Sequence, residues 1–317
     1  NVVPIYKGGN DNIFSNYRPV SVLPVFSKIL ERLMYIRLLK FINKHKLLYE
    51  YQFGFRQGHS TAMALITIVD RISEALDKGK CVVGIFLDFS KAFDTVDHNI
   101  LLSKLNHYGI RGITLNWFES YLENREQYVT YNSTKSSKSK ISYGVPQGSI
   151  YDLSTMSNAK IPVLFVDDTN LFYTGDKLDE LVCYIIIKLQ KIVEWLECNK
   201  LSLNITKTHY IIFCNRGKII NDLPIKLKNE YIERVYFTKF LGVLIDASLS
   251  WKYHIDYTTK KIAKCIGILC KARKVLNVST LVSLYYSFVY PYYIYCSHIW
   301  GNTYTTNLNK LVLQQKR

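Results

Sequence analysis

The chain has 317 residues, of which 48% are apolar, so it can bury a sizeable core and is not expected to be disordered. Its 41 Lys and Arg outnumber its 25 Asp and Glu, which gives a formal net charge of +16. A balance this basic favours a partner that carries many phosphates, with nucleic acid as the leading candidate. A generally basic soluble protein has the same composition, so charge alone leaves that alternative open.

The seven cysteines are scattered and include no C-x-x-C pair. This pattern predicts free thiols in a reducing compartment, with neither a disulfide framework nor a zinc site. The N-terminal residues contain prolines and no signal-peptide core, so the protein is expected to be intracellular and not secreted. The most apolar stretch, 281–295, contains serines and a proline and is predicted to be a buried helix and turn, with no membrane partner.

The first part of the chain predicts two helices and a buried strand. Residues 27–45 carry apolar side chains at helical spacing, and residues 61–76 form a second helix with Ser60 or Thr61 as its N-cap. Residues 81–89 read CVVGIFLDF. Their β-branched and aromatic content without alternation indicates a strand that is buried on both faces and ends in its single charge, Asp88.

The remainder of the chain predicts further hairpins and helices. Helices are expected at 100–105, 113–122 and 178–196, hairpins at 127–145 and 161–173, and strands at 200–213 and 237–245. The connection inside the first hairpin is basic and is expected to be a solvated loop. After Trp251 an apolar stripe and a basic face predict a separate small helical domain.

Three acids lie next to apolar strand sequences, Asp88 at the end of one strand and Asp167 and Asp168 in the turn of a hairpin. Adjacent acids without glycine repel each other and are poor turn residues, and a buried carboxylate needs compensation. If the strand and the hairpin are neighbours in one sheet, the three carboxylates converge and suit Mg²⁺. Two such ions can activate an attacking hydroxyl and stabilise a leaving phosphate oxygen. The structural alternative is a helix N-cap or solvated strand end at Asp88 and an exposed turn at the pair.

Seven segments of the sequence resemble reverse transcriptase motifs, in the family's order. The palm motifs are matched by FLDFSKAFDTVDH (86–98), YGVPQGS (143–149), LFVDDTNLF (164–172), LSLNITKT (201–208) and KFLGVLID (239–246). Upstream, SNYRPVSVLPVFSKILERL (15–33) and QFGFRQGHST (52–61) resemble fingers motifs of non-LTR retrotransposons of the insect jockey type. The resemblance covers nearly the whole chain.

This resemblance implies an α+β fold of the right-hand polymerase type, with an antiparallel palm sheet. Residues 1–80 would be the N-terminal part of the fingers, 81–246 the palm with the remaining fingers, and 247–317 a small helical thumb and the start of the connection. The implied activity is that of an RNA-directed DNA polymerase, which transfers nucleotides from dNTPs to a primer 3′-hydroxyl. The implied partners are an RNA template, a DNA primer and their RNA–DNA duplex, and the implied location is the nucleus, the cytoplasm or both.

The resemblance also assigns roles to residues. Asp88 and Asp167 would bind two Mg²⁺ ions, or Mn²⁺, with Asp168 beside them and the Phe89 carbonyl completing the coordination. Phe93 matches a steric gate that excludes the 2′-hydroxyl, with a core aromatic as the alternative. Further matched positions are the nucleotide-binding residues Lys7, Arg18, Gln147 and Lys207, with Lys207 as a general acid toward pyrophosphate, the primer grip Phe240, Leu241 and Gly242, and the thumb lysines Lys260, Lys261, Lys264 and Lys271. For the basic residues a plain solvated charge is the alternative.

The sequence departs from the family pattern after Ser149. The family continues with a long apolar helix, whereas this chain continues with IYDLSTMSNAKIP, several helical turns shorter. The chain also begins inside the fingers, without an endonuclease domain, and stops soon after the thumb. The alternatives are therefore a truncated, catalytically impaired copy that retains only RNA or DNA binding, or a relic that does not fold.

Overall fold

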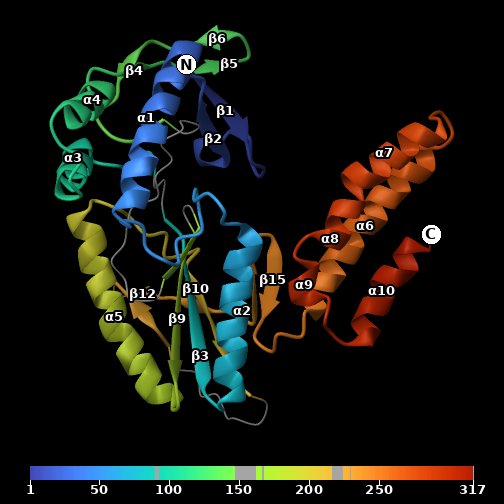
Figure 1. Cartoon of the computed structure of the whole chain (residues 1–317). Helices are drawn as coiled ribbons and strands as arrows, with labels where there is room; N and C mark the ends of the chain where they lie inside the picture. Colours follow the sequence, from blue (N-terminus) through green and yellow to red (C-terminus); the bar gives the residue numbers. More distant parts are fainter. Residues whose placement is uncertain (90–92, 147–161, 166–167, 216–223, 229, 317) are drawn as a thin grey trace.

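A computed structural model describes residues 1–89, 93–146, 162–165, 168–215, 224–228 and 230–316. For residues 162–165 and 168 it describes the backbone alone. Figure 1 shows a central sheet flanked by two long helices, a layer that contains the N-terminus at one end of the sheet, and a group of C-terminal helices at its side.

The central sheet has five strands in the order β13-β10-β3-β9-β8. Its middle strand, β3 (Cys81–Leu87), is buried along its whole length, as predicted from its unbroken apolar sequence. It pairs antiparallel with β9 (Asp168–Gly175) and with β10 (His209–Phe213). The outer strands are β8 (Pro162–Phe165), antiparallel to β9, and β13 (Glu233–Arg234), parallel to β10.

The two faces of this sheet are covered by different helices (Figure 1). Helix α2 (Thr61–Asp77) packs on the face that carries Val82 and Phe86, whereas α5 (Leu178–Cys198) packs on the face that carries Val83 and Ile85. The alternation follows from the two-residue period of a strand. Ser60 is the N-cap of α2, because its hydroxyl accepts a hydrogen bond from the Met63 amide.

The N-terminal layer combines a strand pair, three helices and short ribbons. The strands β1 (Val2–Tyr6) and β2 (Tyr17–Ser21) pair antiparallel, with a 3-10 turn, η1 (Phe14–Asn16), between them. Helices α1 (Val25–Lys44), α3 (His98–His107) and α4 (Ile113–Leu122) share a small core. The ribbons are β4 (Glu126–Gln127) with β7 (Ser139–Lys140), and β5 (Thr130–Tyr131) with β6 (Thr134–Lys135).

A hairpin connects the sheet to the C-terminal helices. Strands β14 (Phe237–Phe240) and β15 (Val243–Asp246) pair antiparallel, and Phe240 packs into the same core as α2. Asp246 is 2% exposed and accepts hydrogen bonds from the amides of Ser248, Ser250 and Trp251, which fixes the start of the next helix. The remaining elements are β11 (Lys226–Leu227), β12 (Glu230–Tyr231), α6 (Lys252–Ala272), α7 (Val278–Phe288), α8 (Tyr290–Ile294), α9 (Ser297–Trp300) and α10 (Thr305–Gln315).

Several predictions of local structure were wrong in detail. The segment 200–213 is a strand only from His209, because residues 205–207 form a turn. Residues 237–245 form a hairpin and not one strand. The basic connection 132–140, which was expected to be a loop, contains the strands β6 and β7. The segment 281–295 is mostly exposed: α7 has no buried residue, and Val289 is the buried residue of this segment. Within the part of the chain that the structure describes, no helix combines the length and apolar character that a membrane span requires.

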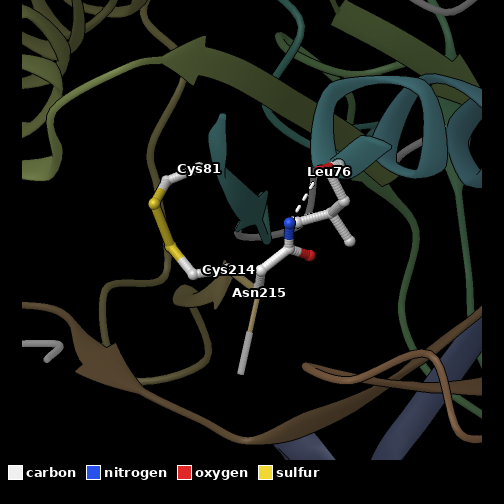
Figure 2. Close-up of a disulfide and its surroundings, with 4 residues drawn as sticks. All are labelled: Leu76, Cys81, Cys214 and Asn215. Carbon is white, nitrogen blue, oxygen red and sulfur yellow. Dashed lines mark hydrogen bonds between the residues drawn. A yellow bond between two sulfur atoms is a disulfide. The ribbon is translucent and has the colours of Figure 1, made fainter. Parts of the chain in front are cut away.

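The prediction that all cysteines are free thiols was also wrong. Cys81 and Cys214 form a disulfide, shown in Figure 2 beside the hydrogen bond of 2.8 Å from Asn215 Nδ2 to the Leu76 carbonyl. The physical reason is the register of two strands, because Val82 pairs with Phe213 and the next residues outward then lie opposite each other. Their Cα atoms are 4.7 Å apart, within disulfide reach. The other five cysteines are free.

Candidate active site

Asp88 lies where β3 ends, opposite the start of β9. The ladder between the two strands ends with Leu87 opposite Thr169, so Asp88 follows β3 at the end where β9 begins with Asp168. Directly opposed residues in an antiparallel pair have Cα atoms about 4.5–5.5 Å apart. Phe165 at the end of β8 also pairs with Asp168, so the end of β8 lies at the same end of the sheet. Asp167 lies outside the described residues. The predicted neighbourhood of the strand end and the hairpin is therefore present.

The backbone of Asp88 is anchored on its other side by the turn after α5. Its carbonyl accepts a hydrogen bond of 2.8 Å from the Asn204 amide, and its own amide donates to Thr208 Oγ1 at 3.4 Å. Phe89 forms a bridge to Leu203. Lys207 is exposed within this turn and immediately precedes Thr208, whose hydroxyl accepts the hydrogen bond from the Asp88 amide.

The Asp88 carboxylate is available to a cation. Its residue is partly exposed, and among the described residues no lysine, arginine or histidine forms an ion pair with it. Carboxylate and backbone carbonyl oxygens are the ligands that Mg²⁺ and Mn²⁺ prefer. The residues present therefore fit a divalent metal. The described residues contain no cluster of three or more metal-binding side chains, and Asp167 is not among them.

The loop that follows Asp88 is tied to the YGVPQ segment. The Val145 amide donates to the Phe93 carbonyl and the Gly144 amide to the Val96 carbonyl, both at 2.8 Å. His98 Nε2 lies 2.8 Å from the Gly144 carbonyl. Phe93 is 8% exposed, so its ring is largely buried at this junction. Gln147, two residues beyond Val145, lies outside the described residues.

Asp97 organises the same junction, a role that was not predicted from the sequence. Its Oδ1 accepts hydrogen bonds from the amides of Asn99 and Ile100, which makes it the N-cap of α3. Its Oδ2 accepts a hydrogen bond of 2.7 Å from Lys200 Nζ. The hydrogen bond from Lys200, helped by the Ile100 amide, lowers the pKa of the Asp97 carboxyl. An aspartate immediately before a helix is an N-cap signal that could have revealed this role.

The predicted primer-grip residues form the turn between β14 and β15. Phe240 is buried and its ring centroid lies 6.0 Å from that of Phe86 on β3, two residues before Asp88. Phe86 also stacks on His209 with a centroid distance of 5.3 Å. The hairpin is thereby packed against the strand that ends in Asp88. Leu241 and Gly242 follow at the turn itself.

The remaining predicted basic residues lie away from the central sheet. Arg18 is in β2 opposite Ile5, and Lys7 follows β1, so both belong to the strand pair of the N-terminal layer and both are exposed. Lys260, Lys264 and Lys271 are exposed on α6. Lys261 is partly buried, with its ammonium 5.6 Å from the centre of the Tyr257 ring.

A cavity in the N-terminal layer was not anticipated. It has a volume of about 610 Å³ and lies between α1 and the loop 53–59. Its lining mixes cationic and aromatic side chains and contains no acid, with Arg32, Lys40 and Arg56 beside Tyr35 and Phe55. Positive charge interleaved with aromatic rings is typical of surfaces that bind single-stranded nucleic acid. The residues that line the cavity come from α1 and from the loop 53–59, so no local pattern in the sequence indicated it.

Comparison with known proteins identifies the class of protein. Residues 5–253 match the family model described as reverse transcriptase (RNA-dependent DNA polymerase). This match covers most of the chain and includes both the strand end at Asp88 and the primer-grip turn. The chain therefore belongs to the reverse transcriptase family.

The relatives belong to mobile elements of insects. The chain is 28% identical to "Probable RNA-directed DNA polymerase from transposon BS" of Drosophila melanogaster, over 100% of this chain and 37% of the relative. It is 29% identical to the "RNA-directed DNA polymerase from mobile element jockey" of the same species, over 99% and 36%. A solved telomerase of Candida albicans, in complex with a fragment of telomeric RNA, has a TM-score of 0.45 and 11% identity over 95% of this chain and 60% of its own.

These comparisons confirm the predicted kinship with jockey-like non-LTR retrotransposons and the α+β polymerase fold. The chain spans about a third of the length of the curated relatives it matches. The matches run through the whole chain and do not favour the alternative of an impaired copy that only binds nucleic acid. The shortened segment after Ser149 lies outside the described residues. The predicted boundaries of fingers, palm and thumb stay predictions.

Proposed function

We propose that this chain is an RNA-directed DNA polymerase domain that extends a DNA primer on an RNA template. The observation that supports the proposal is the antiparallel pairing of β3 with β9, in which the end of β3, followed by Asp88, and the start of β9 at Asp168 lie at the same end of the sheet within a reverse transcriptase domain. Carboxylates from separate strands at one end of a sheet suit chemistry at a phosphate group, because the divalent cations that they would hold can offset its negative charge. The substrates are deoxynucleoside triphosphates and a primer 3′-hydroxyl.

Reverse transcriptases use divalent metal ions, and two Mg²⁺ ions are proposed here. Asp88, Asp167 and Asp168, with the Phe89 carbonyl, would hold them. When bound, such ions activate the attacking hydroxyl and stabilise the charge of the departing phosphate. The primer oxygen then forms a bond to the α-phosphorus as the bond to the pyrophosphate oxygen breaks.

The other site residues would bind and orient the substrates. Phe93, buried at the junction with the YGVPQ segment, would exclude a 2′-hydroxyl by its bulk. Lys207, exposed in the turn beside Asp88, would give a proton to the leaving pyrophosphate. Gln147 would contact the incoming nucleotide, and Lys7 and Arg18 would bind the triphosphate if the N-terminal layer closes over the sheet.

The exposed lysines of α6 would follow the phosphates of the RNA–DNA duplex. Action on chromosomal DNA would take place in the nucleus.

Primer extension tests this proposal. A labelled DNA primer annealed to an RNA template is incubated with the four dNTPs and Mg²⁺, and products are compared for wild type, Asp88→Asn and Asp167→Asn. Each substitution removes one carboxylate charge and is expected to lower the extension rate at least about a thousandfold, since charge stabilisation of the transition state is usually the largest single contribution.

Asp176→Asn is the matched control, because Asp176 is an acid just beyond the far end of β9 and its side chain is 80% exposed. It should extend like the wild type. Extension by Asp88→Asn at the wild-type rate, or product that does not depend on added metal, contradicts the proposal.

A further inference from the structure

The turn of the β14–β15 hairpin has a backbone that needs support. Leu241 and Gly242 both have positive φ, 45° and 86°, the combination found in tight two-residue hairpin turns. Glycine adopts this conformation freely, whereas a bulky residue such as leucine does so at a steric cost. Contacts from outside the hairpin must therefore hold Leu241 in place, because the backbone of an isolated turn could relax to a less strained conformation.

Those contacts come from Tyr295, which lies between α8 and α9. Its hydroxyl donates a hydrogen bond of 2.6 Å to the Leu241 carbonyl. The same oxygen lies 3.2 Å from the hydroxyl of Thr61, the first residue of α2, which can donate to it. The ring lies against Gly242, where a Cβ atom would come within 3.1 Å of Tyr295 Cε1. One side chain thus joins the hairpin turn, the start of α2 and the C-terminal helices.

Tyr295 is itself held in the correct place. Its carbonyl accepts a hydrogen bond of 2.9 Å from the indole of Trp300, which is 3% exposed in the core beneath α6. Partial burial raises the pKa of the Tyr295 hydroxyl. The hydroxyl therefore keeps its proton at neutral pH and remains a donor to Leu241. Figure 1 shows β15 between α2 and the C-terminal helices, the arrangement that these contacts stabilise.

We propose that Tyr295 is a positioning residue for the primer end, acting through the Leu241–Gly242 turn. The inference rests on the proposed function, because it takes this turn as the surface that contacts the primer. The hydroxyl fixes the orientation of the Leu241 peptide, and the ring fixes the path of the backbone at Gly242. Both effects concern the primer and leave Phe93, the proposed nucleotide-binding residue, untouched, so the two substrates should respond differently.

Steady-state kinetics of Tyr295→Phe test this difference. The variant keeps the ring and removes the hydroxyl, and we expect the KM for primer–template to rise roughly fivefold, the equivalent of one hydrogen bond. The KM for dNTP and kcat should change less than about twofold, since no group at the reacting atoms is altered. Tyr293→Phe is the matched control, because the Tyr293 hydroxyl donates to the Leu311 carbonyl at 3.4 Å and its bond stays within the C-terminal helices.

A second variant perturbs the same turn without removing the Tyr295 hydroxyl. Gly242→Ala retains the Tyr295 hydroxyl but puts a methyl group against its ring, and should also raise the KM for primer–template selectively. The proposal is overturned if Tyr295→Phe behaves like Tyr293→Phe, or if its KM for dNTP rises as much as that for primer–template. Wild-type protein that extends no primer contradicts the proposed function instead, which separates the two failures.

Discussion

At the scale of single residues, His254 shows how burial alone can set a charge state. It lies on α6, is 4% exposed, and its Nδ1 accepts a hydrogen bond of 3.3 Å from the Leu244 amide. Its ring packs beside Trp300 with a centroid distance of 5.4 Å. Burial, with a smaller effect of Lys239, lowers the pKa of His254 to about 4. The contact of α6 with β15 thus depends on a neutral imidazole.

Stability should therefore depend on pH through His254. In the unfolded chain this histidine has a pKa of about 6.5. Between pH 6.5 and 4 the unfolded state binds a proton that the folded state does not, so the full stability is present above pH 6.5 and decreases as the pH falls. A shift of this size is worth about 3 kcal/mol. Urea unfolding at a series of pH values from neutral down toward the folded-state pKa measures it.

His254→Asn should abolish most of this pH dependence, whatever its effect on stability at neutral pH. His298→Asn, at an exposed position on α9, serves as control and should keep the wild-type slope. If wild type and His254→Asn lose stability in parallel on acidification, His254 is not the responsible group.

At the scale of elements, β3 is shaped by the side chains of its neighbours. A Cβ atom at Gly84 would come within 2.8 Å of Phe172 Cε1 and 3.3 Å of Phe213 Cε2, on the strands at either side. The absence of a side chain at this position lets both rings pack across β3. The sequence CVVGIFLDF predicted the strand correctly, but it carried no sign of which rings would cover the glycine.

Gly84→Ala should therefore destabilise the protein by about 1–3 kcal/mol, the usual effect of overpacking a core. Thermal or urea unfolding at neutral pH measures the change. Gly267→Ala is the matched control, because no atom lies within 4 Å of a Cβ at that position of α6. It should be neutral or stabilising, as glycine is a poor helix former. Equal effects of the two substitutions would rule out the packing explanation.

Helix α1 illustrates what periodicity left open. The apolar spacing of residues 27–45 predicted the helix, and the structure confirms one at Val25–Lys44. Its core contacts come from Leu38 and Ile42, however, whereas Ile29, Leu30 and Leu33 are each more than half exposed. Periodicity identifies an apolar face, but the neighbours that the fold supplies decide which part of that face is covered.

At the scale of the whole molecule, the net charge of +16 should govern binding of nucleic acid. The slope of log K against log salt decreases by about 0.9 for each duplex phosphate that the protein no longer neutralises. If Lys260, Lys264 and Lys271 contact the duplex, replacing all three by Gln should lower the slope for an RNA–DNA duplex by about 2–3. Fluorescence anisotropy at several salt concentrations measures this slope.

The control removes the same number of charges from lysines that form ion pairs with glutamates, namely Lys78, Lys177 and Lys228. Its net charge equals that of the α6 variant, so any difference between them reports position and not total charge. Identical slopes for the two triple variants would mean that α6 is not the surface that follows the duplex.

The sequence by itself determined the central strand that ends in Asp88, the order of the motifs and the basic helix after Trp251, because each depends on composition and spacing within a short segment. Only the tertiary structure decided which residues face one another. The pairing of β3 with β9, the disulfide of Cys81 with Cys214 and the contact of Tyr295 with the hairpin turn all join segments far apart in the chain. Strand register and the docking of helices are fixed by the packing of the whole core, and no local pattern encodes them.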